Sequence, residues 1–339
     1  MLRRRTFLAG LAALGAAGCS TGEAAPALTG ALPTAAPPPD TKLTISIRST
    51  LIQLEQSGEL TKLPFKVPDW PNIQAGPDVI QAFRANSVDL ATNAGIPPIQ
   101  AKANRFDARI VAVGQREKPL YTFAGAPGLA LNDLKDLRGK KIAFSQGQAQ
   151  GVVVLRTLKE LGLKNTDVEL VGLTSNQFLT ALQAQQVDVA VLAEPVLTKY
   201  LGQYPDAKSL AMNAVDLLTI LWAPVSVLND PAKLAAVRAF IPFWARGQVW
   251  AYENPDKWVD AYYVKDQNVT KADGDRIVKA TPELVFPANW DRAIRWEQET
   301  VDLLADGGFV PSFKADELFD RRFEHIAAEA VDAEYRSST

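Results

Sequence analysis

Apolar and polar residues alternate with two different periods over the first two thirds of the chain. Short apolar runs typical of strands occur at 43–47, 65–67, 88–91, 109–113, 141–144, 168–171 and 187–192. Between them, apolar residues recur at helical spacing at 76–83, 98–104, 152–161 and around Phe178. This repeated alternation predicts an α/β fold with a mostly parallel sheet. The later elements repeat the order of the earlier ones, so we predict two α/β lobes.

The last third of the chain shows only the helical period. Helices are predicted at 231–254, 288–306 and 316–334. Pro242 lies inside the first of them and is expected to kink or split it, because proline removes a backbone donor and crowds the preceding turn. The pair Gly307-Gly308 provides a stop signal for the second helix.

The start of the chain has the pattern of an export signal. Three arginines at 3–5 precede an uncharged apolar run at 7–17, which is too short to span a bilayer as a helix. The residues that lead into Cys19 resemble a bacterial lipobox, and the arginines with the Thr-Phe-Leu that follows resemble a twin-arginine signal. We predict that residues 1–18 are a lipoprotein signal peptide. A lipid on Cys19 would then anchor an extracytoplasmic protein to the cell membrane; an ordinary signal peptide with an incidental cysteine is the alternative.

A segment rich in alanine and proline follows at 19–41. It has few large apolar side chains to offset the entropy cost of ordering, so we expect a flexible linker. The rest is expected to divide into lobe I at 42–126, lobe II at 127–223, and a return to lobe I with C-terminal helices at 224–339. Hinge strands are expected near 123–128 and 223–227.

Composition narrows the chemistry that the chain can perform. Its 339 residues include one Cys and one His, and the formal net charge is −2. One cysteine and His325 provide no disulfide framework, no Cys/His zinc site and no Ser-His or Cys-His machinery in its ordinary form. We therefore expect neither an enzyme nor a cofactor or metal. The slightly acidic balance offers no basic surface for nucleic acid.

Several blocks of sequence, in their order, resemble one family of binding proteins. They lie at 76–83, 88–91, 93–101, 134–143, 187–195, 254–256 and 308–311. This order resembles the solute-binding proteins of ABC importers for aliphatic sulfonates, taurine and nitrate. The resemblance implies a type II periplasmic-binding-protein fold, in which a hinge joins two lobes and the C-terminal helices pack on lobe I. It also implies a monomer that captures a small, sulfonate-like organic anion and delivers it to an ABC permease.

Two places depart from the family pattern, and both touch the expected pocket. Ala193-Glu194 stands where members often carry an acidic or aromatic pair before the proline. Arg48-Ser49-Thr50 stands where the first strand commonly ends in a polar turn with glycine. The ligand of this chain therefore need not be the commonest one of the family.

In an open α/β sheet, ligands bind beyond the carboxyl ends of the strands, where loops and helix starts converge. Four loops qualify, at 48–50, 70–76, 93–97 and 146–151. Two of them lead into helix N-termini, whose unpaired N–H groups and dipole favour an anion. The residues expected to line the site are Arg48, Ser49, Thr50, Trp70, Gly76, Asn93, Ala94, Gly95, Gln148, Ala149, Gln150, Glu194 and Trp222. Nearly the same set suits a neutral polar ligand.

Four of these residues have a second interpretation. Arg48 either adds a full charge for an anion or forms an ion pair at the surface. Glu194 either binds an amino group of a zwitterionic ligand or forms an ion pair between the lobes. Trp70 and Trp222 either contact the ligand or pack in the core.

Two other functions are open on the same fold. One is a binder of a neutral, aromatic or pyrimidine-like ligand, for import or for sensing. The other is an enzyme similar to the pyrimidine-synthesising branch of this superfamily, which uses a cysteine-rich segment and an active-site histidine. The chain has no cysteine after Cys19, and His325 is predicted to lie far from the cleft, so the enzyme is disfavoured.

Overall fold

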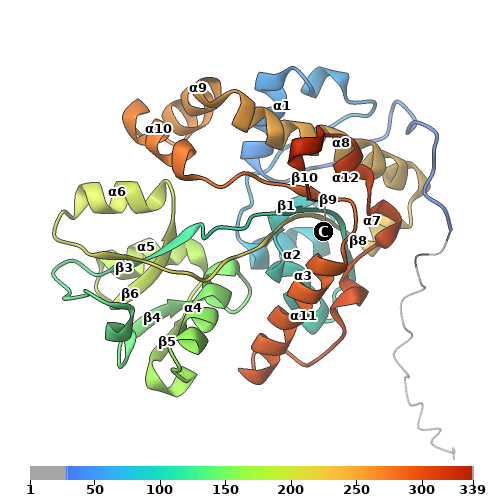
Figure 1. Ribbon diagram of the computed structural model, residues 1–339. Coiled ribbons are helices and arrows are strands. Elements are labelled where there is room, and N and C mark those ends of the chain that lie inside the picture. The colour runs from blue at the N-terminus through green and yellow to red at the C-terminus, as the bar shows by residue number, and fades with distance from the viewer. Residues whose placement is uncertain (1–27, 29, 338–339) are drawn as a thin grey trace, which may run out of the picture.

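Two β-sheets, each covered by helices, divide the molecule into two lobes (Figure 1). The computed structural model describes residue 28 and residues 30–337. The predictions for residues 1–18 and for Cys19 therefore fall outside the described residues. We use lobe I for the part built on a three-stranded sheet and lobe II for the part built on a five-stranded sheet.

Both sheets contain antiparallel pairs. In lobe I the strand order is β1-β8-β2, and both pairs are antiparallel. In lobe II the order is β5-β4-β6-β3-β7, with β4 parallel to β5 and β6, and β3 antiparallel to β6 and β7. The strands are β1 (Ala91–Ala94), β2 (Ala108–Gln115), β3 (Tyr121–Gly125), β4 (Lys141–Phe144), β5 (Glu169–Gly172), β6 (Val189–Ala193), β7 (Ser209–Ala211) and β8 (Leu218–Pro224). The α/β fold is confirmed, but the mostly parallel sheet is wrong, because strands that carry the chain between the lobes run against their neighbours.

The two apolar runs at the start of the fold are extended but form no regular strand. Residues 43–47 and 65–67 join their neighbours through isolated parallel bridges, Lys42 with Lys66 and Ile45 with Leu90. Leu43 and Ile45 are fully buried, so the alternating pattern correctly identified their core-facing side chains. The strand expected at 88–91 begins only at its last residue.

Most predicted helices of the two lobes are present, with shifted ends. The helices are α1 (Arg48–Ser57), α2 (Gly76–Arg84), α3 (Ile96–Ala103), α4 (Ala149–Glu160), α5 (Ser175–Gln183), α6 (Val196–Gln203), α7 (Val225–Leu228), α8 (Pro231–Glu253), α9 (Pro255–Trp258), α10 (Lys271–Ala280), α11 (Asp291–Asp306) and α12 (Ile326–Glu329). Short helical turns lie at η1 (Leu60–Lys62), η2 (Leu134–Leu137), η3 (Asn165–Asp167), η5 (Ala315–Leu318), η6 (Arg321–Phe323) and η7 (Ala333–Tyr335), and η4 (Val259–Asp266) is a π-helix. A short parallel pair, β9 (Phe286–Pro287) with β10 (Arg336–Ser337), completes the fold.

The C-terminal helices pack mainly on lobe I and correct two predictions. Helix α8, which packs against α1 and α12, runs through Pro242 without a break, so the expected split of this helix is wrong. The single helix expected at 316–334 is wrong. There the Asp320 N–H donates to the Ile110 carbonyl of β2 (3.0 Å), so the backbone pairs with a strand edge and breaks into short turns.

The described part of the expected linker lies against lobe I. Leu32 packs on the hydrophobic core, and Arg322 donates to the Gly30 carbonyl (3.4 Å). Asp40 forms an ion pair with Lys66 (2.5 Å). Residues 30–41 therefore form a strap along α8 and α12, although their composition predicted no stable packing.

Two connections join the lobes. The first runs from β2 to β3 through 116–120, and the second from β7 to β8 through 212–217. The hinge was expected near 123–128 and 223–227, but these segments begin inside β3 and β8, where the backbone is already paired within a sheet. The crossings lie a few residues earlier in the chain.

Candidate functional site

A cavity of about 300 Å³ lies between the lobes, where several helices begin. Lobe I contributes Ile47, Gln74, Gly76, Thr92, Asn93, Ala94 and Pro97, and lobe II contributes Tyr121, Gln148, Ala149, Gln150 and Ser175. We call it the cleft cavity. It adjoins a larger cavity of about 690 Å³, the outer cavity, with which it shares Gln74, Gln150 and Ser175.

Helix N-termini face the cleft cavity. Helices α1, α2 and α4 have Ile47, Ala75 and Gln148 at the N-cap, and none of these side chains caps its helix. The first N–H groups of a helix have no partner within the helix, and its dipole places partial positive charge at that end. Helix α5 also begins at the cavity, with Ser175 in its lining. The cavity is therefore electropositive through backbone groups.

Among residues 30–337, no charged side chain lines the cleft cavity. Arg48, expected to supply a charge, lies outside it with 52% of its side chain exposed and forms an ion pair with Asp266. The hydrogen bond to Asp266 raises the pKa of the Arg48 guanidinium, so this residue is a fixed cation of the surface. An anion in the cavity would be held by N–H groups, amides and hydroxyls alone.

Hydrogen bonds hold the polar wall of lobe II in place. The buried Gln148 amide oxygen accepts from the Ser145 hydroxyl and from the Ser175 N–H, both at 2.8 Å. The Gln148 amide nitrogen donates to the Ser175 hydroxyl oxygen (2.7 Å). Because this oxygen accepts from Gln148, its own hydrogen is free to donate to a ligand. Gln148 thus positions Ser175.

A similar arrangement orders the wall of lobe I. The Asn93 amide nitrogen donates to the Gln74 carbonyl (3.1 Å), and its amide oxygen accepts from the Trp222 indole (2.8 Å). Trp222 is fully buried and packs edge-on against Phe83. It therefore contributes to the site by fixing Asn93, and its ring lies in the core.

The other residues that were predicted to line the site lie in different parts of the structure. Trp70 packs against Phe240 in the core, Thr50 is buried, and Ser49 lines a separate cavity near the π-helix. Glu194 lines the outer cavity, where Arg276 of α10 pairs with it (3.2 Å) and Thr198 donates to it. Gly95 lies directly behind the cleft cavity. A side chain there would meet the Glu297 carboxylate at 2.5 Å.

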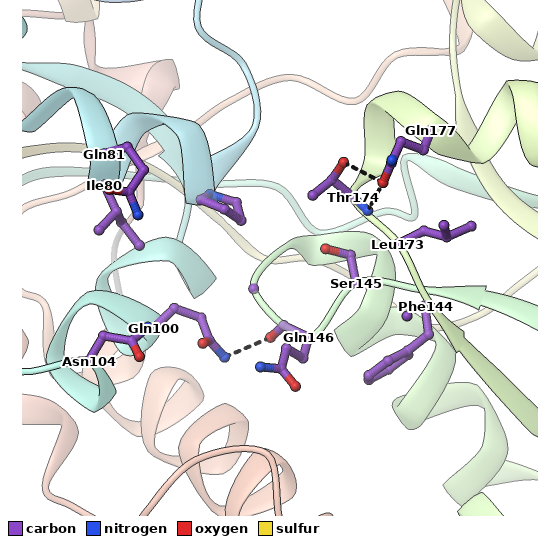
Figure 2. Close-up of a pocket in the computed structure, with 13 residues that line it drawn as sticks. Ile80, Gln81, Gln100, Asn104, Phe144, Ser145, Gln146, Leu173, Thr174 and Gln177 are labelled. Carbon is purple, nitrogen blue, oxygen red and sulfur yellow. Dashed lines mark hydrogen bonds between the residues drawn. The ribbon is translucent and has the colours of Figure 1, made fainter.

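Beside the cleft cavity, the two lobes contact each other at a glycine, which has no side chain to keep them apart. Gly147 of lobe II packs on lobe I so closely that a Cβ there would lie 3.2 Å from the Gln100 side chain and 3.5 Å from Pro77. The Gln100 amide donates to the Gln146 carbonyl (2.9 Å), which Figure 2 shows as the bond across the interface. Around this bond lies a further cavity of about 440 Å³. The structure thus has the lobes in contact.

Sequence reasoning missed Gln74, Thr92, Tyr121 and Ser175 in the cleft cavity. Ser175 follows β5, and a search of every strand end for polar residues would have found it. Tyr121 begins β3, two residues before the segment that was expected to be a hinge. Ile47 has φ 98°, a conformation that is strained for a β-branched residue and frequent at functional sites.

A group of buried charges lies behind the cleft cavity. Glu297 of α11 is 1% exposed, and Asp216 of the second connection is 9% exposed. Burial, reinforced by their mutual repulsion in the case of Glu297, raises the pKa of Glu297 to about 8 and that of Asp216 to about 7; Arg156 opposes both shifts. Arg156 extends from α4 of lobe II to lobe I, where it stacks on Trp296 (4.0 Å) and donates to Thr300 (2.9 Å).

The fold and the interlobe cavity define a periplasmic-binding-protein fold. The alkanesulfonate-binding protein SsuA of Xanthomonas axonopodis pv. citri, solved with MOPS, superposes with a TM-score of 0.70 at 21% identity, over 88% of this chain and 99% of that one. The periplasmic nitrate-binding protein NrtA of Synechocystis PCC 6803 gives a TM-score of 0.67 at 14% identity, over 90% and 93%.

Sequence comparison defines the family. The pattern of the family described as NMT1/THI5 like matches residues 72–258, and the chain belongs to this family. An aliphatic sulfonates-binding protein of Escherichia coli (strain K12) is 31% identical over 134 residues, which are 40% of this chain and 42% of that protein. One of Bacillus subtilis (strain 168) is 23% identical over 69% of this chain and 70% of that protein. These relatives are named as binding proteins and not as enzymes.

Replacing Glu297 with Gln should flatten the pH dependence of stability. A carboxyl whose pKa is raised on folding stabilises the fold at low pH, and this contribution is lost as pH rises from its unfolded value near 4.5 through about 8. We expect the free energy of unfolding of the native protein to fall by a few kcal/mol between pH 5 and pH 9, and that of E297Q to fall by less. Urea titrations across this range measure the slope.

The control for this experiment is Glu299→Gln, on the same helix. Glu299 is exposed, so E299Q should keep the native slope. If the free energy of unfolding of E297Q and that of the native protein depend on pH equally, the raised pKa of Glu297 is wrong.

Proposed function

We propose that this chain is the solute-binding component of an ABC importer and that it captures a small organic sulfonate in the cleft cavity. The observation that carries the proposal is the convergence of the uncapped N-termini of α2 from lobe I and α4 from lobe II on a cavity that no charged side chain of the described residues lines. The names of the curated relatives support the ligand class and the partner, an ABC permease. The lipid on Cys19, the extracytoplasmic location and the monomeric state belong to the same proposal.

A sulfonate suits this cavity because of its charge and its shape. It stays ionised across the physiological pH range and offers three oxygens that only accept hydrogen bonds, so it matches a wall of donors. The Ser175 hydroxyl, the Gly76 N–H at the start of α2 and the Ala149 and Gln150 N–H groups at the start of α4 are such donors. The organic part would extend into the outer cavity.

Binding would be coupled to closure of the lobes. A ligand that contacts α2 and α4 together bridges lobe I and lobe II, so it favours the arrangement in which they touch. Residues 116–120 and 212–217 would form the hinge between lobe I and lobe II, and the permease would recognise the closed form. Among the described residues, no helix is long and apolar enough to span a membrane.

Glu194 would select ligands that also carry a cation. Together with Asp78 it gives the outer cavity an acidic lining, and no lysine or arginine of the residues that the structure describes lines this space. Arg276 approaches Glu194 from α10 and satisfies part of its charge. An amino group of an aminosulfonate would complete this pairing when the sulfonate occupies the cleft cavity.

Ethanesulfonate should bind the purified protein with one site, as measured by isothermal titration calorimetry. The variant Ser175→Ala removes a charge-assisted donor, so its dissociation constant should rise about tenfold. Arg48→Gln should leave the constant within twofold, because Arg48 lies outside the cavity. Ethanol and ethylamine, which lack the sulfonate, should give no heat. If these neutral or cationic solutes bind and ethanesulfonate does not, the proposed anion site is wrong.

Replacing Gly147 with Leu should weaken ethanesulfonate binding by tenfold or more. The new side chain would collide only with Gln100 and Pro77 of the opposite lobe, so it opposes closure and leaves each lobe intact. Gly202→Leu is the matched control, because a Cβ at Gly202 of α6 has open space around it. Both variants should melt like the native protein without ligand. A native affinity for G147L would exclude closure at this contact.

The role of Glu194 can be tested with a pair of ligands that differ in one amino group. Taurine carries the amine and ethanesulfonate does not, so Glu194→Gln should reduce the affinity for taurine severalfold and spare ethanesulfonate. Calorimetric titrations of both ligands give the ratio. An unchanged ratio would remove Glu194 from ligand selection.

A further inference from the structure

Another cavity lies behind the outer cavity, among the helices that cover lobe I. Its volume is about 190 Å³. Its walls come from α1, α8, α9, α10 and the π-helix η4, which gather above the sheets in Figure 1. Tyr262 lines both this space and the outer cavity. We call it the aromatic cavity, because Tyr252, Trp258, Tyr262 and Tyr263 line it.

The π-helix shapes this wall. In η4 the backbone bonds span five residues, as in the bond from the Gln267 N–H to the Tyr262 carbonyl (2.8 Å). Tyr262 stacks on Trp258 at 4.5 Å with an interplanar angle of 6°, and Tyr263 meets Tyr262 edge-on at 5.0 Å. π-helical turns are rare and occur frequently at functional sites. The ring faces are therefore held in a fixed arrangement.

Within the described part of the chain, Arg116 is the only charged side chain that lines the aromatic cavity. Its guanidinium donates to the Tyr252 hydroxyl (3.2 Å) and to the Thr219 hydroxyl, which fixes its position. Burial raises the pKa of Tyr263 to about 12, so its phenol stays protonated. Ser49 and Thr281 add hydroxyls, and Gln248 adds an amide. The cavity thus combines flat apolar faces, hydrogen-bond donors and one cation.

We propose that the aromatic cavity is a second binding site, separate from the sulfonate site, for a small aromatic acid. The ring would lie against Trp258 and Tyr262, and the carboxylate or sulfonate would pair with Arg116. A guanidinium binds such groups through two parallel hydrogen bonds. A cavity of about 150 Å³ holds a benzene ring, so the observed volume of about 190 Å³ admits one ring with a single acidic substituent.

Benzoate is the probe for this site. In calorimetric titrations of the purified full chain, benzoate should bind with one site, and saturation with ethanesulfonate should leave that site available. Benzyl alcohol, which has the ring without the charge, should bind at least tenfold more weakly. Arg116→Gln keeps a donor for Tyr252 but removes the charge, so it should raise the benzoate dissociation constant at least tenfold and keep that of ethanesulfonate within twofold.

Two further variants keep the result interpretable. Arg238→Gln removes a charge from α8 outside the aromatic and cleft cavities and should leave benzoate binding unchanged. Ala251→Leu fills the aromatic cavity from α8 and should abolish benzoate binding even if R116Q fails to fold. Absence of benzoate binding, competition with ethanesulfonate, or native binding by A251L would overturn the second site. Ethanesulfonate binding is measured separately, so either proposal can fail without the other.

Discussion

The structure depends on backbone N–H groups that the helices themselves leave without partners. Helices α1, α2 and α4 begin between the lobes, and their N-cap side chains do not cap them; only the Arg48 N–H of α1 donates to a side chain, that of Asn72 (3.4 Å). Such groups are costly to bury without an acceptor. Water or a ligand oxygen must satisfy them, and an anion also gains from the helix dipoles. The site therefore needs no arginine, and the neutral residues around it mainly fix its geometry.

Small residues make this convergence possible. A Cβ at Gly76 would lie 2.4 Å from Pro97 and 3.1 Å from the Gly147 carbonyl. Gly76 therefore allows the starts of α2 and α3 to approach each other and the opposite lobe. Gly95 likewise has no side chain, and this allows the Glu297 carboxylate to lie against it. Burial raises the pKa of Glu297 and of Asp216 behind the cleft cavity, and the charge of Arg156 opposes this rise.

Three of the cavities differ in the charge of the residues that line them. The cleft cavity has only neutral lining residues, the outer cavity is acidic, and the aromatic cavity has one arginine. Tyr262 separates the last two. The outer cavity shares Gln74, Gln150 and Ser175 with the cleft cavity and Tyr262 with the aromatic cavity, so only substitutions of residues that are not shared can change binding in one space alone.

The sequence by itself determined the α/β class, the two lobes and the loops that carry the site. Local periodicity places β2, β4, α2 and α4, and the order of blocks indicates the family, because both are properties of neighbouring residues. It could not determine which side chains meet. Arg48 pairs with Asp266, 218 residues away, and Ser175 reaches the cleft through Gln148, 27 residues away. The strap at 30–41 and the break at 319–320 also depend on distant partners. Only tertiary structure decided these features, since contact energy between remote segments overrides local propensity.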